Sequence, residues 1–208
     1  MTTIYLIRHS APFAQIDNYT NYKDVLWKEY NKNMILSPLG EEKAKELCNI
    51  EELNNINEVY SSNSSRAIET AKYFAESNNV KIKLDDRIKE REFGVLYLKD
   101  LPNDFNKLSF DDKTYKIGDG ESLDDVDNRF KSFISELLDK NIDRVIIVMH
   151  GIILLSYLES ICDYFDFDGK RFYIKYKDNI VLDGTPSNPS VYKIEFNNKN
   201  VINVSYVK

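Results

Sequence analysis

The chain has 208 residues, of which 42% are hydrophobic and 30% charged, and its formal net charge is −6. This composition is typical of a soluble globular protein, and the length fits one domain over residues 1–208. The negative charge argues against nucleic acid or an anionic membrane surface as the partner. The longest apolar run, 145–155, is too short to span a bilayer, and no secretory signal is recognisable, so we expect a cytoplasmic protein.

Strand and helix patterns alternate through the first half of the chain. Residues 2–7 form an apolar run typical of a buried strand, and residues 15–36 form a polar, aromatic insertion. Ser37-Pro38 supplies an N-cap and a first-turn proline for a helix whose buried positions should be Leu39, Ala44, Leu47 and Cys48. A short strand at 59–60, a Ser-rich turn at 61–65, a second helix and a strand at 80–84 should follow.

The second half of the chain begins with a long irregular stretch over 85–120, which contains a second insertion at 96–118. A loop of this length in a compact domain is usually functional. The capping-box pattern of Ser122 and Asp125 opens a helix, and a strand at 145–149 leads into a helix over 152–162. Strands should then close the fold at 181–182, 191–196 and 201–207, the last two as a hairpin. The alternation predicts a three-layer α/β/α fold with a mostly parallel central sheet.

The chain contains two histidines, and each follows an apolar strand pattern. His9 stands between Arg8 and Ser10 after the first strand, and His150 precedes Gly151 after a later one. Because ligands bind at the carboxyl ends of parallel strands, the two imidazoles could meet in one crevice. A neutral imidazole is a competent nucleophile, and an adjacent guanidinium can hold a phosphate through two hydrogen bonds. Gly151 would let an anion approach the start of the following helix.

Two other segments carry candidate groups. Arg66 lies in the first turn of a predicted helix, where guanidinium and helix N-terminus could bind phosphate together, although a solvent-facing arginine is the simpler alternative. Glu90 or Glu92 could protonate a leaving oxygen, or the run could be a solvated charge cluster. The histidines lack HxH or HxxxH spacing, which argues against a metal site, and the absence of Gly-x-Ser-x-Gly argues against a serine hydrolase.

In order along the chain, these motifs resemble those of the histidine phosphatase superfamily, in the branch that includes cofactor-dependent phosphoglycerate mutase and its phosphatase relatives. The resemblance covers nearly the whole chain. Its segments are Arg8-His9-Ser10, Leu36 to Gly40, Tyr60 to Ser62 with Arg66, Glu90 to Gly94, Gly120 to Ser122, and Met149-His150-Gly151. The family fold implied is the phosphoglycerate mutase-like α/β/α sandwich.

The resemblance implies a phosphohistidine mechanism that uses no metal or other cofactor. His9 would attack phosphorus, while Arg8, Arg66 and His150 bind the phosphoryl oxygens and stabilise the transition state. Glu90 stands at the position of the family's acid, which protonates the leaving alcohol and later activates water. Glu92 is a nearby competitor for that role, and the spacing to Gly94 selects Glu90.

The chain departs from the family pattern at two positions. Ser10 stands where the family usually has glycine, and its hydroxyl could donate to phosphate or could impair turnover. Gln15 stands where the family often has asparagine. The stretch 101–116 lacks the basic, proline-rich character of the mutases, which favours hydrolysis. We therefore predict a phosphomonoesterase acting on a small phosphorylated metabolite. The alternatives are a phosphoglycerate mutase and a phospholigand-binding protein whose turnover Ser10 has impaired.

Overall fold

The computed structural model describes residues 1–13 and 26–208, and its main element is a six-stranded sheet in the order β3-β2-β4-β1-β8-β9. The first four strands in that order pair in parallel, and β8 and β9 are antiparallel, so the prediction of a mostly parallel central sheet is confirmed. The strands are β1 (Thr2–Arg8), β2 (Glu58–Ser61), β3 (Ile82–Leu84), β4 (Arg144–Met149), β8 (Ser190–Asn197) and β9 (Asn200–Tyr206).

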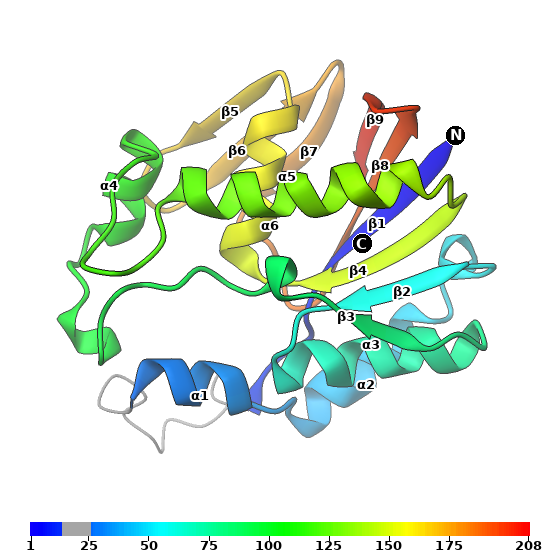
Figure 1. The fold of residues 1–208 in the computed structure, drawn as a ribbon, viewed down its shortest axis with the longest axis horizontal. Coiled ribbons are helices and arrows are strands. Elements are labelled where there is room, and N and C mark those ends of the chain that lie inside the picture. The colour runs from blue at the N-terminus through cyan, green and yellow to red at the C-terminus, as the bar shows by residue number, and fades with distance from the viewer. Residues whose placement is uncertain (14–25) are drawn as a thin grey trace.

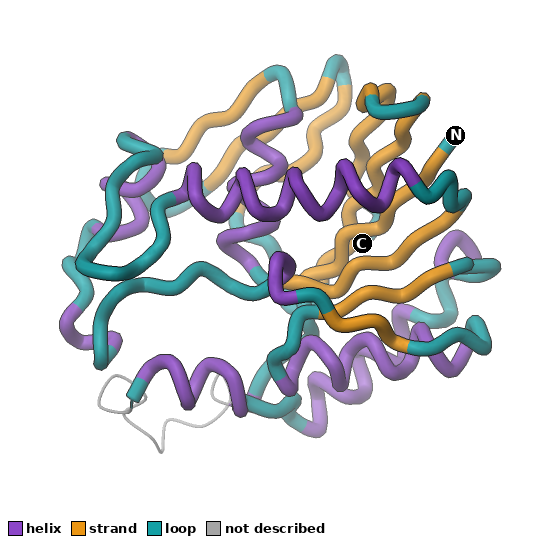
Figure 2. Tube along the Cα trace, in the orientation of Figure 1, coloured by secondary structure: helices purple, strands orange, loops and turns teal. Residues whose placement is uncertain are grey.

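Helices cover both faces of this sheet (Figures 1 and 2). On one face lie α2 (Pro38–Leu47) and α3 (Ser65–Ser77), and on the other lie α5 (Leu123–Asp139) and α6 (Gly151–Ile161). Side chains alternate across β1, so that Leu6 packs in the core beneath α5 and α6 while Ile7 packs in the core beneath α3. Both are fully buried, as expected for a strand covered on both sides.

The two strands that precede the histidines are direct neighbours. β1 and β4 pair in parallel with Arg8 opposite Met149, and the His9 amide donates to the Met149 carbonyl oxygen at 2.9 Å. Parallel neighbours end at the same edge of a sheet, so His9 and His150 emerge together. The expectation that strand ends would bring them to one place is confirmed.

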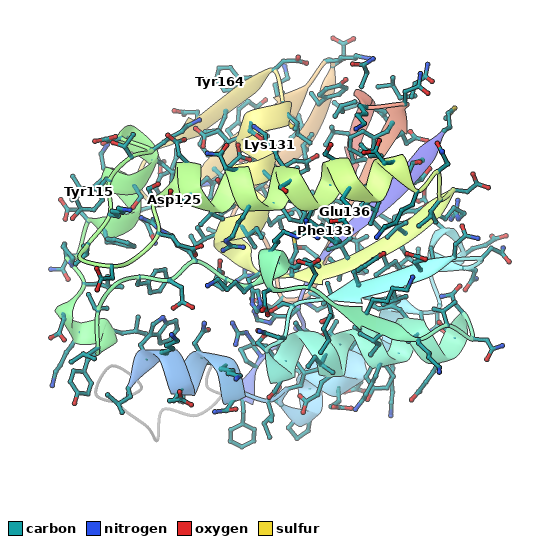
Figure 3. The ribbon with its side chains drawn as sticks, in the orientation of Figure 1. Tyr115, Asp125, Lys131, Phe133, Glu136 and Tyr164 are labelled. Carbon is teal, nitrogen blue, oxygen red and sulfur yellow. The ribbon has the colours of Figure 1, made fainter. Side chains whose placement is uncertain are left out.

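The predicted helix starts are also confirmed, but the buried positions predicted for the helix after Ser37 are only partly confirmed. Ser122 and Asp125 form the capping box of α5, whose Phe133 is buried while Lys131 and Glu136 stay exposed (Figure 3). In α2, however, Leu39 is 46% exposed, Gly40 takes the inner position, and Cys48 is the partly buried C-cap. A Cβ on Gly40 would lie 2.1 Å from the Ala11 carbonyl oxygen, so only glycine fits there.

Several elements escape the sequence patterns. A second, antiparallel sheet contains β5 (Tyr164–Phe167), β6 (Phe172–Tyr176) and β7 (Asn179–Gly184), of which only residues 181–182 were predicted as strand. The insertions contain α1 (Trp27–Asn33) and α4 (Phe105–Asp111), and short 3₁₀ turns occur at η3 (Glu51–Leu53), η4 (Asp86–Ile88) and η5 (Leu98–Asp100). None of the helices in the described residues is long and apolar enough to cross a membrane.

Arg91 anchors the second insertion to the body of the domain. This side chain is 1% exposed, and it donates to the Glu121 carbonyl, the Ser109 hydroxyl and the Tyr115 carbonyl at 2.7, 2.7 and 2.9 Å. A buried guanidinium is stable only when its donors are satisfied, so these contacts fix the insertion against the backbone at residue 91. The fold of this segment therefore determines where the adjacent Glu90 lies.

Candidate active site

The guanidinium of Arg66 joins the two histidines. Its Nε–H donates to His9 Nε2 at 3.0 Å, and its Nη2 donates to His150 Nδ1 at 2.9 Å. The two imidazole centroids lie 5.2 Å apart, and all three side chains are buried. Arg66 occupies the first turn of α3, directly after the Ser-rich turn that follows β2. Three predicted residues from distant parts of the sequence thus meet at one point.

The hydrogen bonds fix the tautomer of each imidazole. His9 Nδ1 lies 2.8 Å from the Ser10 carbonyl oxygen, which can only accept, so Nδ1 carries the proton. Its Nε2 is then the nitrogen with a lone pair. In His150 the roles are reversed, because Nδ1 accepts from Arg66 and Nε2 donates to the Ser62 hydroxyl at 2.7 Å. Both rings are therefore neutral.

Electrostatics keep both rings uncharged. Burial lowers the pKa of His9 well below its usual value, and the positive charges of Arg66 and Arg8 lower it further. The pKa of His150 is depressed in the same way, by burial first and then by Arg66. Arg66 itself has its pKa lowered by burial to about 10, opposed by the negative charge of Glu90, so it stays protonated at neutral pH.

Arg8 lies against the N-terminus of α6. A Cβ added at Gly151 would sit 3.3 Å from Arg8 Nε, so glycine leaves room for this approach. Arg8 Nη1 donates to the Pro186 carbonyl oxygen, but the buried Nε has no hydrogen-bond partner among the described residues. A buried donor without an acceptor costs about 1–3 kcal/mol. An oxygen-rich anion would remove that cost.

The two candidate acids occupy different places. Glu90 caps α6, because its Oε2 accepts from the Ile152 amide at 3.2 Å and its Oε1 accepts from the Ile153 amide at 3.3 Å. Glu92 instead pairs with Lys89, with 3.3 Å between Oε1 and Nζ. Only Glu90 touches the backbone that begins at His150, although both side chains line the same pocket.

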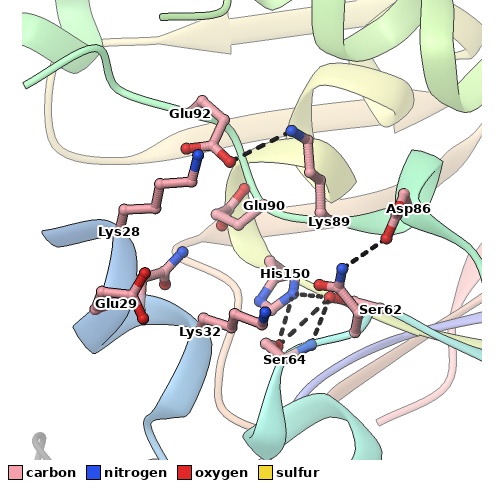
Figure 4. A pocket seen from close by; sticks show the side chains of 12 residues that line it. Lys28, Glu29, Lys32, Ser62, Ser64, Asp86, Lys89, Glu90, Glu92 and His150 are labelled. Atoms are coloured by element: carbon pink, nitrogen blue, oxygen red, sulfur yellow. Dashed lines mark hydrogen bonds and ion pairs between the residues drawn. The ribbon is translucent and has the colours of Figure 1, made fainter.

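That pocket has a volume of about 270 Å³ and opens above His150, Ser62 and Ser64. Figure 4 shows Lys28, Glu29 and Lys32 on α1 along one wall and Glu90, Glu92 and Lys89 opposite them. No sequence pattern predicted α1 at this position, because no residue of this short helix is buried. Asn31, which also lines the pocket, contacts Arg66 directly.

Of the two positions that depart from the family pattern, Ser10 and Gln15, the structure describes only Ser10. The Ser10 hydroxyl donates to the Gly40 carbonyl at 2.7 Å, and the Ser10 amide donates to Thr70 Oγ1 at 3.0 Å. Ser10 is fully buried and does not adopt a positive φ. Its hydroxyl thus connects β1 to α2 in this structure and is not directed at the arginines. Gln15 lies outside the described residues.

The fold and the site define a class of protein: an α/β/α sandwich with a candidate anion site at the ends of its parallel strands. Two cationic side chains, a helix N-terminus and two neutral imidazoles converge there. No group of three or more His, Cys, Asp or Glu among the described residues is arranged to hold a metal ion.

The chain belongs to the histidine phosphatase superfamily (branch 1), whose sequence model matches residues 4–197. A curated relative is phosphoserine phosphatase 1 of Hydrogenobacter thermophilus, which is 28% identical over 156 residues that cover 72% of this chain and 70% of the relative.

Solved structures show the same fold. The α-ribazole phosphatase of Shigella flexneri superposes with a TM-score of 0.67 at 18% identity, covering 96% of this chain and 93% of that one. The mycobacterial glucosyl-3-phosphoglycerate phosphatase superposes with a TM-score of 0.69 at 18% identity, covering 94% of this chain and 93% of that one. The family resemblance seen in the sequence and the expected fold class are therefore confirmed.

Replacing Ser10 tests whether its hydroxyl serves structure or ligand. Ser10→Ala and Ser10→Gly remove the bond to Gly40, so the free energy of unfolding should fall by about 1 kcal/mol and by about 2 kcal/mol respectively. Phosphate affinity, measured by calorimetry, should stay within about threefold of the wild type. A loss of tenfold or more in both variants would instead place the hydroxyl on the phosphate.

The depressed pKa of both histidines predicts a pH-dependent stability. The unfolded chain binds protons on these residues below its pKa of about 6.5, whereas the folded chain resists protonation. Stability should therefore be complete above about pH 6.5 and fall as the pH drops below it, by up to about 1.4 kcal/mol per pH unit for each histidine.

Denaturant unfolding of the wild type and of His9→Gln/His150→Gln between pH 7.5 and 5 measures this effect. Carboxylates titrate in both proteins, so the difference between the two slopes isolates the histidines. Parallel curves would show that the imidazoles do not resist protonation in the folded protein.

Proposed function

We propose that this protein is a phosphomonoesterase that hydrolyses a small phosphorylated metabolite through a phosphohistidine on His9. One observation carries the proposal: the neutral, buried imidazole of His9 directs its Nε2 lone pair at Arg66 within the positive field of Arg66 and Arg8, and Arg8 Nε is a buried donor without an acceptor among the described residues. This arrangement supports attack on an anionic phosphorus centre. The relatives named above are phosphatases, which supports the same reading.

In the first step His9 Nε2 forms a bond to phosphorus, and the bond from phosphorus to the ester oxygen breaks. Arg8, Arg66 and His150 neutralise charge on the non-bridging oxygens as the transition state forms. The Ser10 carbonyl accepts from His9 Nδ1 and holds the ring in the nucleophilic tautomer. The Glu90 carboxylate takes up a proton from solvent or from the substrate monoanion, and it gives this proton to the departing alkoxide, which leaves as an alcohol.

In the second step water attacks the phosphohistidine. Glu90, now a carboxylate, takes a proton from that water as its oxygen bonds to phosphorus, and the bond from phosphorus to Nε2 breaks. Inorganic phosphate leaves, and His9 returns to its neutral state. Glu90 fits this role because it lines the pocket together with His150, where the leaving group of a bound ester would lie.

The pocket volume of about 270 Å³ supports a small leaving group. The proposed partner is therefore a small phosphorylated metabolite, and a cytoplasmic location belongs to the same proposal. The resemblance to the histidine phosphatases implies that no metal ion takes part. We therefore expect the reaction to proceed in the presence of a chelator.

His9→Ala should abolish hydrolysis of a chromogenic aryl phosphate, with a loss of at least about 10⁴-fold in kcat, because no other group forms the covalent intermediate. The wild type should retain its rate with chelator present. Rapid quenching at alkaline pH followed by mass spectrometry should locate a phosphoryl group on the peptide that contains His9.

Three results would redirect the proposal. Retained hydrolysis in His9→Ala would remove His9 as the nucleophile. Phosphate binding without any hydrolysis by the wild type would favour a phospholigand-binding protein. Rapid conversion of 3-phosphoglycerate to 2-phosphoglycerate would favour a mutase.

The acid can be identified by varying the leaving group. A nitrophenolate departs without a proton, whereas an alkoxide needs one, so Glu90→Gln should slow an alkyl phosphate about 10²-fold or more and an aryl phosphate far less. Glu92→Gln is the matched control and should treat the two esters alike. If Glu92→Gln shows the selective loss and Glu90→Gln does not, the acid is Glu92.

A further inference from the structure

Asn31 occupies the side of Arg66 that faces away from the histidines. Arg66 Nη1 donates to the Asn31 backbone oxygen, and Arg66 Nη2 donates to the Asn31 side-chain oxygen Oδ1 at 2.7 Å. Two oxygens of one residue thus fill the two terminal nitrogens of one guanidinium. Arg66 is 4% exposed, and Asn31 is partly exposed where it lines the pocket.

This is the geometry in which a phosphoryl group binds arginine. Two non-bridging oxygens accept from two nitrogens of the guanidinium, and such paired bonds are stronger than neutral ones. On its other side Arg66 is already engaged by His9 and His150. His9 Nε2 must release Arg66 Nε–H before it can attack phosphorus, and the terminal nitrogens of Arg66 are the ones that Asn31 contacts. A phosphoryl group that pairs with both terminal nitrogens therefore displaces Asn31.

We propose that Asn31 competes with the phosphoryl group for Arg66. The two Asn31 oxygens occupy the positions of two phosphoryl oxygens on Arg66, and Asn31 leaves when substrate binds. The proposal rests on the proposed function, since it assigns Arg66 to the phosphate. Asn31 is thereby a further determinant of the affinity for substrate and for phosphate, supplied by α1 and not by the motifs that surround His9.

The attachment of α1 is suited to such a displacement. The helix has seven residues, buries none of them and has no side-chain N-cap. It is held to the segment that follows Glu90, because the Trp27 ring stacks on Phe93 at 5.5 Å between centroids and the Trp27 amide donates to the Leu96 carbonyl at 2.8 Å. Movement of α1 is thus connected to the segment that carries the proposed acid.

The chemistry of residue 31 sets how strongly it competes. Asparagine is neutral, so its bonds to Arg66 are weaker than those of a phosphate dianion. Aspartate at this position would form an ion pair with Arg66 and close the site. Alanine would lose the Oδ1 bond and keep only the backbone contact. The two substitutions should therefore change phosphate affinity in opposite directions.

Calorimetric titration with inorganic phosphate tests this in the full-length protein. Asn31→Ala should lower the Kd for phosphate by about three- to tenfold, and Asn31→Asp should raise it at least about tenfold. Asn33→Ala and Asn33→Asp are the matched controls on the same helix, since the Asn33 side chain donates to the Glu29 carbonyl and is exposed. Both should keep the wild-type Kd. Thermal unfolding of each variant verifies that it is folded.

Hydrogen exchange provides a second readout. Addition of phosphate should speed the exchange of amides in residues 27–33, because the ligand releases the helix from Arg66. Weaker phosphate binding by both Asn31 variants would overturn the proposal and make Asn31 a positioning residue for Arg66. Unchanged Kd values would show that Asn31 does not compete. Phosphate binding that follows the predicted order without any hydrolysis would refute the proposed function alone.

Discussion

The site depends on one buried positive charge whose hydrogen-bond partners are neutral. Arg66 is 4% exposed, and no carboxylate lies within ion-pair distance of it among the described residues. Its acceptors are the imidazoles of His9 and His150 and the oxygens of Asn31. Protonation of either imidazole would place a second cation about 3 Å from the first in a medium of low dielectric. Arg66 therefore imposes both the charge state and the tautomer of the two histidines, which is the condition that a nucleophilic nitrogen requires.

The negative charge of Glu90 partly balances the positive charge of Arg66 without direct contact between the two side chains. Its negative charge raises the pKa of both Arg8 and Arg66, against the stronger effect of burial. Glu90 can do this because the N-terminus of α6 holds its carboxylate and because the neighbouring Arg91 fixes the backbone. The protein carries a formal net charge of −6, so the positive field at the strand ends comes from the few charged groups gathered there and not from the protein as a whole. Its components come from β1, α3, α6 and the second insertion, and the parallel sheet brings them to one edge.

Sequence patterns located the parts of the site that follow regular elements. Apolar runs end abruptly at His9 and His150, and the start of α3 places Arg66, so strand-end reasoning predicted where these residues meet. The same reasoning did not predict the position of Asn31, because α1 buries no residue and its sequence therefore shows no apolar periodicity. The outcome at Ser10 depended on a contact with the backbone of α2, which no local pattern encodes. The strands of the second sheet mix aromatic with charged residues in short segments, and periodicity alone does not separate those from loops.

A phosphate site is a set of donors that the protein must hold together before the ligand arrives. Here backbone and side-chain oxygens of the chain itself satisfy most of them: Asn31 on Arg66, Glu90 on the α6 amides and Pro186 on Arg8. Each of these oxygens reduces the cost of an empty site, and in the proposed function a bound phosphoryl group competes with those on Arg66 and Arg8. In the same proposal this competition weakens the binding of the product, because inorganic phosphate meets the same competitors as the ester. Binding that is equally strong for substrate, transition state and product does not raise kcat, whereas internal competition limits how long phosphate stays. Arg8 Nε is the exception, a buried donor that has no acceptor among the described residues and that the proposed function assigns to the phosphoryl group.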